Sequence, residues 1–192
     1  PPSPSPPPPL LPPPPSLYSQ YASTIAGWAS GKQFTTLCYS KQQHGASSSA
    51  FHSGCDGRGA SLTIMRLSTG KIIGGYTSAS WSSSSGYSSD CTACLFSSTN
   101  NYKHTIQHLS SCSEYAMYRR SDYGPTFGNG HDLHISSNMN SGYCDPGRAY
   151  TCRTGSYGST TCRNDFCGSY NGWTVAELEV WVGESALPPP PP

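Results

Sequence analysis

Charged residues are scarce in this sequence. They make up 11% of the chain, against about 25% in typical soluble proteins, and the net charge is only +1. So small a charge excludes the basic footprint of a nucleic-acid-binding protein. A surface of this kind also has little electrostatic repulsion between copies. We therefore expect a surface that either associates with other molecules or is kept hydrated by attached sugar.

Long apolar runs and N-glycosylation sequons are also missing. No run approaches the length of about 18 residues that a membrane helix needs, so we expect no membrane span. The chain starts without an initiator methionine or a signal peptide, which fits an exported protein whose leader has been removed. No Asn-x-Ser/Thr sequon occurs, so we do not expect N-linked glycans.

Proline is almost absent from the body of the chain, where only Pro125 and Pro146 occur, and it is concentrated at the two ends. Proline fixes φ and has no N–H group, so such runs favour the extended polyproline II helix. At about 3.1 Å per residue, the first segment would reach about 45 Å. It would act as a stiff spacer, as a ligand for an aromatic groove, or as a disordered linker. We therefore expect a proline-rich rod at 1–15, one domain at 16–186 and the start of a second rod at 187–192.

The chain has nine cysteines. This density favours disulfides formed in an oxidising compartment. Zinc is disfavoured because only Cys91 and Cys94 have knuckle-type spacing, and a redox pair is disfavoured because Cys94 leads into a predicted strand rather than a helix. The odd number leaves one free thiol or one bond between chains. The disulfide candidates are Cys38, Cys55, Cys91, Cys94, Cys112, Cys144, Cys152, Cys162 and Cys167.

Hydrophobic periodicity predicts many short strands and little helix. Both faces of the segment 61–67 look buried, and in the last predicted strand Leu178, Val180 and Val182 face inward while Glu177 and Glu179 face outward. The pattern predicts a β-rich α+β fold, a sandwich of antiparallel sheets with a few helices. The predicted helical segments are 20–29 and 47–55, and the predicted strands are 34–39, 61–67, 72–77, 94–97, 115–118, 132–135 and 177–182.

Three stretches of the sequence resemble the TLDc family: residues 50–81, 123–136 and 173–182. Their order and spacing match that family over most of 17–183. The resemblance implies a TLDc-like fold of two antiparallel sheets packed as a sandwich with short helices at the flanks. The extra cysteines and the loop 141–170 depart from the family pattern. The most specific matching residues are Phe51, His52, Cys55, Asp56, Gly74, Gly75, Tyr76, Thr77 and Trp81.

The resemblance says less about activity. TLDc domains are linked to oxidation resistance and, in intracellular members, to binding the proton-pumping V-ATPase. No catalytic set of residues is agreed for the family, and an exported copy would not meet the cytosolic face of that pump. Fold does not by itself give function.

The residues themselves do not predict an enzyme. Glu177 and Glu179 lie two residues apart, which indicates an exposed sheet face rather than a glycosidase pair. His131 and His134 are three apart on a predicted strand, which would place them on opposite faces and exclude a shared metal.

Other motifs are equally weak. His104 and His108 fall on a strand and a loop rather than on one helix face. The glycine-rich segment 124–130 lacks the Lys-Ser/Thr ending of a phosphate loop and predicts a tight turn. His131-Asp132 predicts a structural hydrogen bond, and Asp56 has too few neighbouring ligands for calcium. We expect no catalytic residue, no metal and no cofactor.

The proline-rich ends resemble the rods of plant and green-algal wall glycoproteins of the extensin and pherophorin type. That resemblance implies hydroxylated prolines that carry O-linked sugar. The modification candidates are Pro1, Pro2, Ser3, Pro4, Ser5, Pro6, Pro7, Pro8, Pro9, Pro12, Pro13, Pro14, Pro15, Pro188, Pro189, Pro190, Pro191 and Pro192.

These observations predict a secreted, structural subunit of a glycoprotein fibre, wall or matrix. Its rods would join globules head to tail, with other wall or matrix glycoproteins as further partners. The candidates for the rod-binding surface are Tyr143, Tyr150, Tyr157 and Tyr170, with Trp28, Tyr87 and Tyr123 also considered and Trp81 and Trp173 assigned to the core. Two alternatives stay open: an adhesive or carbohydrate-binding module presented on proline-rich spacers, and a secreted enzyme.

Overall fold

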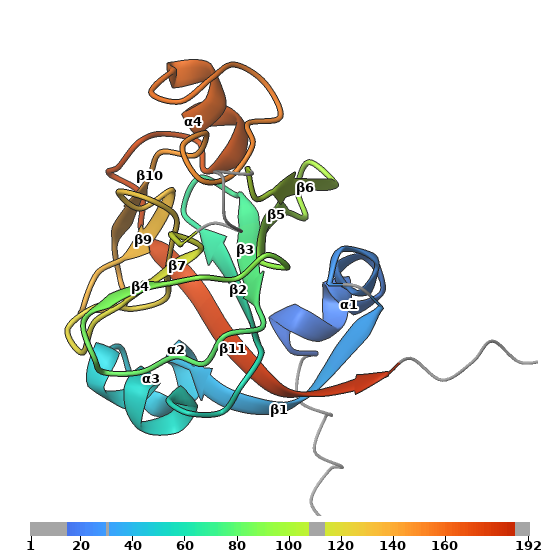
Figure 1. The fold of residues 1–192 in the computed structure, drawn as a ribbon, viewed down its shortest axis with the longest axis vertical. Helices are drawn as coiled ribbons and strands as arrows, with labels where there is room; N and C mark the ends of the chain where they lie inside the picture. Colours follow the sequence, from blue (N-terminus) through green and yellow to red (C-terminus); the bar gives the residue numbers. More distant parts are fainter. Residues whose placement is uncertain (1–14, 30, 108–113, 187–192) are drawn as a thin grey trace, which may run out of the picture.

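The computed structural model describes residues 15–29, 31–107 and 114–186, the side chains of 184–186 excepted. They form two antiparallel sheets with short helices around them (Figure 1). This arrangement confirms the predicted sandwich; the proline-rich segments lie outside the described residues, apart from the exposed Pro15.

The first sheet has six strands and the second has five. In spatial order, the first sheet contains β1 (Lys32–Ser40), β11 (Val175–Ala186), β2 (Ser61–Leu67), β3 (Ile72–Thr77), β5 (Cys94–Ser97) and β6 (Tyr102–Thr105). The second sheet contains β10 (Gly142–Cys144), β9 (Leu133–Ile135), β8 (Thr126–Phe127), β7 (Met117–Arg119) and β4 (Gly86–Ser88). The helices are α1 (Leu17–Trp28), α2 (Lys41–His44), α3 (Ser48–Cys55) and α4 (Thr160–Phe166).

Local sequence signals locate several elements. The β2–β3 hairpin and β5 have the predicted bounds. Helix α3 begins where predicted, because the Ser47 hydroxyl accepts a hydrogen bond from the N–H of Ala50 and so satisfies one of the unpaired donors of the first turn. Helix α1 begins earlier than predicted, after Ser16, whose hydroxyl accepts from the N–H of Ser19.

The main core lies between the two sheets. Met65 and Leu95 of the first sheet belong to the same buried cluster as Phe127 and Leu133 of the second. A Cβ atom added at Gly75 would lie 2.7 Å from the Phe127 ring. Gly75 therefore lets the two sheets approach closely.

Helix α1 covers the other face of the first sheet (Figure 1). Leu17 and Ile25 of the helix belong to a buried cluster with Leu62, Ile64 and Phe96 of the sheet. Both faces of β2 are thus buried, as predicted from its apolar pattern. The second sheet has its outer face directed away from α1.

Glu179 does not face solvent as predicted. Its side chain is only 9% exposed, and its carboxylate accepts hydrogen bonds from the N–H groups of Leu17 at 2.9 Å and Tyr18 at 3.0 Å. The Trp181 indole N–H donates to it at 2.8 Å. The prediction failed because α1 lies over this face of β11, and a helix start requires acceptors. Glu177 is separate from this site and pairs with Arg66 at 2.8 Å.

Disulfides join Cys38 to Cys55, Cys144 to Cys167 and Cys152 to Cys162. Cys91 is also disulfide-bonded, whereas Cys112 lies outside the described residues. Cys94 is a free, buried thiol, which corrects its inclusion among the disulfide candidates. Cys94 belongs to the cluster beneath α1, and burial raises the pKa of its thiol to about 11.

Two features are absent from the described ranges. There, no helix has the length and apolar character to cross a membrane. In the same residues no cluster of three or more His, Cys, Asp or Glu side chains is arranged to hold a metal ion.

Candidate functional site

A row of residues crosses the outer face of the second sheet. Tyr87 pairs with Tyr118, His134 pairs with Thr126, and Tyr143 pairs with His134. The pairing of Met117 with Phe127 places Tyr118 opposite Thr126. Because side chains alternate between the faces of a strand, residues next to this row point into the core. The fully buried neighbours are Met117, Phe127, Leu133, Ile135 and Cys144.

The rings of this row form a continuous chain of contacts. Their centroid separations are 4.8 Å for Tyr87–Tyr118, 5.8 Å for Tyr118–Tyr123, 4.4 Å for Tyr123–His134 and 5.0 Å for His134–Tyr143. Tyr123 thus bridges the position of Thr126, the one non-aromatic member of the row. We call the whole set the aromatic face: Tyr87, Tyr115, Tyr118, Tyr123, His131, His134, Tyr143 and Tyr170.

Most rings of the aromatic face remain partly accessible. Tyr87, Tyr118, Tyr123 and Tyr143 are half-buried, and Tyr170 is 41% exposed. Aromatic rings carry a large apolar surface with a polar tip, which suits them to binding surfaces. The face is therefore available to a ligand, although its rings are held in place by one another.

Hydrogen bonds fix the orientation of the central rings. His131 Nδ1 lies 2.7 Å from the Tyr143 hydroxyl. The Thr126 hydroxyl donates to the carbonyl of Gly124 at 3.0 Å, so its lone pair accepts from His134 Nδ1–H, also at 3.0 Å. This arrangement selects the Nδ1–H tautomer of His134.

The centre of the aromatic face is uncharged at neutral pH. Burial lowers the pKa of His131, and burial together with neighbouring His131 lowers the pKa of His134 to about 4. Burial also raises the pKa of Tyr143 to about 12. A ligand for this surface therefore needs no complementary charge at the centre.

Charges are confined to the rim of the face. The Arg120 guanidinium lies 5.0 Å from the ring centroid of Tyr123, and the Arg163 guanidinium lies 4.7 Å from that of Tyr170. Each arginine also has a carboxylate partner, Asp122 and Asp145 respectively. These cation–π contacts stabilise the outer rings without adding net charge.

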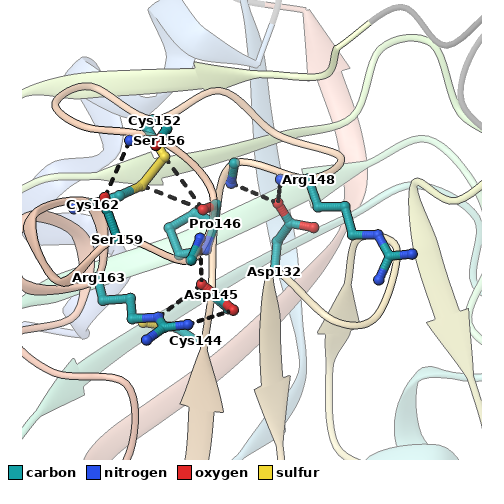
Figure 2. Close-up of polar contacts among 12 residues, drawn as sticks. Asp132, Cys144, Asp145, Pro146, Arg148, Cys152, Ser156, Ser159, Cys162 and Arg163 are labelled. Carbon is teal, nitrogen blue, oxygen red and sulfur yellow. Dashed lines mark hydrogen bonds and ion pairs between the residues drawn. A yellow bond between two sulfur atoms is a disulfide. The ribbon is translucent and has the colours of Figure 1, made fainter.

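The loop 145–170 is anchored by Asp132 (Figure 2). Its carboxylate accepts hydrogen bonds from four consecutive backbone N–H groups, those of residues 147–150, at 3.0 to 3.2 Å. Burial raises the pKa of Asp132 to about 7, and these N–H groups lower it part of the way back. The expected structural hydrogen bond of the His131-Asp132 turn is therefore present.

The same loop is closed by covalent and ionic contacts. Figure 2 shows the Cys152–Cys162 disulfide and the two hydrogen bonds from Arg163 to Asp145, at 2.8 and 2.9 Å. The Cys144–Cys167 disulfide joins β10 to the end of α4. These links hold Tyr143 and Tyr170 in fixed relation.

Only two of the four rod-binding candidates belong to the aromatic face. Tyr143 and Tyr170 contact each other at 5.6 Å. Tyr157 is 50% exposed but lies elsewhere, beneath the Arg148 guanidinium. The prediction that Tyr150 binds a rod was wrong. Tyr150 is 0% exposed, and its hydroxyl donates to the carbonyl of Ala116 at 2.6 Å. Its ring therefore cannot contact a rod.

The wider set of aromatic candidates divides in the same way. Tyr87 and Tyr123 belong to the aromatic face. Trp81 and Trp173 lie in the core as expected, and Trp28 stacks on Phe96. Sequence reasoning missed Tyr115, Tyr118, His131 and His134. The alternation Met117-Tyr118-Arg119 was the available signal for Tyr118, but a strand of three residues carries little periodicity.

The predicted placement of His131 and His134 was also wrong. They were expected on opposite faces of one strand, yet their rings stack with centroids 5.4 Å apart. His131 has φ 74° and precedes β9, so strand alternation does not apply to it. His104 lies on β6 as predicted, and His108 lies outside the described residues.

The comparison with known families agrees with the two-sheet fold. A scan of protein families matches residues 16–183 to the TLDc domain. The chain belongs to the TLDc domain family. No curated protein matches it.

A hollow of about 500 Å³ in this TLDc domain is lined by Ser49, His52, Ser53, Ser83 and Ser121. His52 Nδ1 lies 2.7 Å from Asp56 Oδ1, which resembles part of a catalytic triad. However, His52 Nε2 faces the carbonyl oxygens of Arg120 at 2.8 Å and Tyr123 at 3.1 Å. A general base must instead face the nucleophile, so this pair ties α3 to the segment before β8.

Proposed function

We propose that this TLDc protein is a non-catalytic structural subunit of an extracellular glycoprotein fibre, wall or matrix. Proline-rich rods would link its globules, head to tail. Three disulfides fit a secreted protein. The low charge of the chain favours association over dispersal unless sugar supplies the hydration.

One observation carries the proposal: a half-exposed aromatic face with a neutral centre occurs in the same chain as proline-rich segments at 1–15 and 188–192. Aromatic-lined surfaces bind polyproline because the polyproline helix loses little entropy on docking. A protein with both partners in one chain can join to further copies of itself. O-linked sugar on hydroxyproline would cover the parts of the rods that are not in contact.

Electron microscopy of the native secreted material tests the proposal. We expect fibres with a regular globular repeat and additional density around the connecting segments. Dispersed single globules would overturn it. The material should come from the native source, because a host that does not hydroxylate proline would lack the sugar.

An adhesive or carbohydrate-binding module is the second candidate. The aromatic face could stack on sugar rings, and the serine-rich hollow at His52 adjoins it, since His52 contacts the backbone of Tyr123. Glycan-array binding by the full chain, lost when Tyr123 is replaced by Ala, would favour this candidate. A full chain that forms fibres but binds no glycan would favour the first.

A further inference from the structure

We infer that the aromatic face binds a proline-rich segment of a second copy of this chain, and not that of its own copy. The inference rests on the proposed function and specifies the surface and the partner. The contact joins two different surfaces, the aromatic face of one copy and a proline segment of the next. Such a heterologous contact continues from copy to copy instead of closing on itself, unless its rotation closes a ring.

The chemistry of the two surfaces is complementary. Polyproline has carbonyl acceptors and apolar rings but no N–H donors and no charge. A surface that binds it should therefore provide flat rings, hydroxyl or N–H donors and no uncompensated charge. The aromatic face has flat tyrosine rings whose hydroxyls are donors, neutral histidines at its centre and arginines that are paired with aspartates at its rim.

The dimensions also agree. The second sheet has five strands, and strands lie about 4.8 Å apart, so the row from Tyr87 to Tyr143 spans about 19 Å. At about 3.1 Å per residue, about six residues of polyproline would cross it. The sequence has uninterrupted runs of four prolines at 6–9 and 12–15 and of five prolines at 188–192, so a single run would cover most of the row.

The positions of Pro15 and Ala186 favour binding between copies over binding within one copy. Pro15 adjoins α1, whose first N–H groups are held by Glu179 on the outer face of the first sheet. The aromatic face is the outer face of the other sheet, so the whole sandwich lies between them (Figure 1). At the other end, Ala186 pairs with Lys32 on β1, the edge strand of the first sheet. A stiff proline segment that leaves at either point would have to reverse direction to reach its own aromatic face.

Mixing two variants tests the inference on the full, secreted chain. The face variant carries Tyr118→Ala and Tyr123→Ala, and the rod variant carries serine in place of the prolines of 6–9, 12–15 and 188–192. We expect each variant alone to sediment as a monomer. An equimolar mixture should form complexes of one face variant with one or two rod variants, because the face variant keeps a proline-rich segment at each end and the rod variant keeps its aromatic face. The face variant should self-associate at least about tenfold more weakly than the unmodified chain.

Controls separate this result from misfolding. Tyr157→Ala removes an exposed ring outside the aromatic face and should leave association unchanged. The thermal midpoint of the face variant reports whether it is folded, and its association with the rod variant shows that its own rods remain functional.

The failures can be distinguished. A face variant that still self-associates, or variants that do not associate when mixed, would overturn the inference. If fibres are nevertheless seen in native material, the proposed function stands and the rods join globules in another way. If native material is dispersed and the unmodified chain is monomeric, the proposed function and the inference about the aromatic face both fail.

Discussion

The imidazole rings of His131 and His134 stack with their centroids 5.4 Å apart and their planes 25° from parallel. Each has one ring nitrogen held by a hydroxyl, that of Tyr143 for His131 and that of Thr126 for His134. Stacked imidazoles in a half-buried site are best accommodated as neutral rings, because a proton on one raises the cost of a proton on the other. This pair makes the aromatic face sensitive to acid.

The first prediction concerns the pH dependence of His134. Its pKa falls from 6.5 to about 4 on folding, so the folded state binds fewer protons than the unfolded state in this range. The stability it contributes is therefore present above pH 6.5 and lost as the pH falls to about 4, by roughly 3 kcal/mol. Urea unfolding of the unmodified chain and of His134→Asn across this range measures it. A constant difference between the two would contradict the prediction.

The second prediction concerns the Asp132 anchor. Asp132→Ala removes the acceptor of four backbone N–H groups, of which those of Ala149 and Tyr150 are buried and those of Gly147 and Arg148 part-buried. Each unsatisfied buried group costs about 1–3 kcal/mol, so we expect the variant to lose about 2–6 kcal/mol. Asp132→Asn keeps one acceptor oxygen and should retain part of the stability. Hydrogen exchange of the N–H groups of 147–150 locates the effect, and unchanged protection would refute it.

The third prediction compares two glutamates on one strand. Glu179→Ala leaves the first N–H groups of α1 and the Trp181 indole without their acceptor. We expect a loss of about 2–4 kcal/mol. Glu177→Ala is the matched control, because its pair with Arg66 is only partly buried and should contribute under about 1 kcal/mol. Equal losses in chemical denaturation would contradict this assignment.

The fourth prediction concerns the free thiol. Cys94 is fully buried, and burial raises its pKa to about 11, so both access and thiolate formation are blocked. In the native chain we expect no labelling of Cys94 by iodoacetamide at pH 8, and stoichiometric labelling of Cys94 in denaturant without reductant. Rapid labelling of the native chain at Cys94, identified by peptide mass mapping, would show that the thiol is accessible and would contradict the prediction.

The fifth prediction concerns the proline-rich ends. Mass spectrometry of the native chain should find hydroxyproline and pentose or hexose additions in 1–15 and 188–192, and none on Pro125 or Pro146, because Pro125 and Pro146 lie buried in the globule. If the proline-rich segments carry no such modification, the proposed O-linked glycosylation is contradicted.

The sequence predicted elements whose signals are local. The apolar segments 61–67 and 72–77 predicted β2 and β3, and the helical segment 47–55 predicted α3. Contacts between distant segments were not predictable in the same way. The burial of Glu179 depends on α1 docking about 160 residues away along the chain, and the burial of Tyr150 depends on a bond to Ala116.

The aromatic face was predicted only in part for the same reason. Tyr143 and Tyr170 were among the four tyrosines predicted to bind a rod. Tyr87, Tyr118 and His134 come from strands of three residues, in which alternation is too short to identify a face. The other members, Tyr115, Tyr123 and His131, lie outside the strands, where alternation does not apply. The positive φ of His131 is set by the turn and not by the residue type, so its stacking on His134 had no signal in the pattern.

The clamp between Glu179 and the start of α1 has a mechanical consequence. In a fibre built from such contacts, tension enters a globule at its aromatic face and leaves through the segment that precedes Leu17. Because the Leu17 N–H is bound directly to Glu179 on β11, the force reaches that strand, which β1 and β2 flank on either side. The load therefore crosses the second sheet, the core and the first sheet in turn. The tensile strength of the fibre then depends on the packing of the two sheets against each other as well as on the contact between copies.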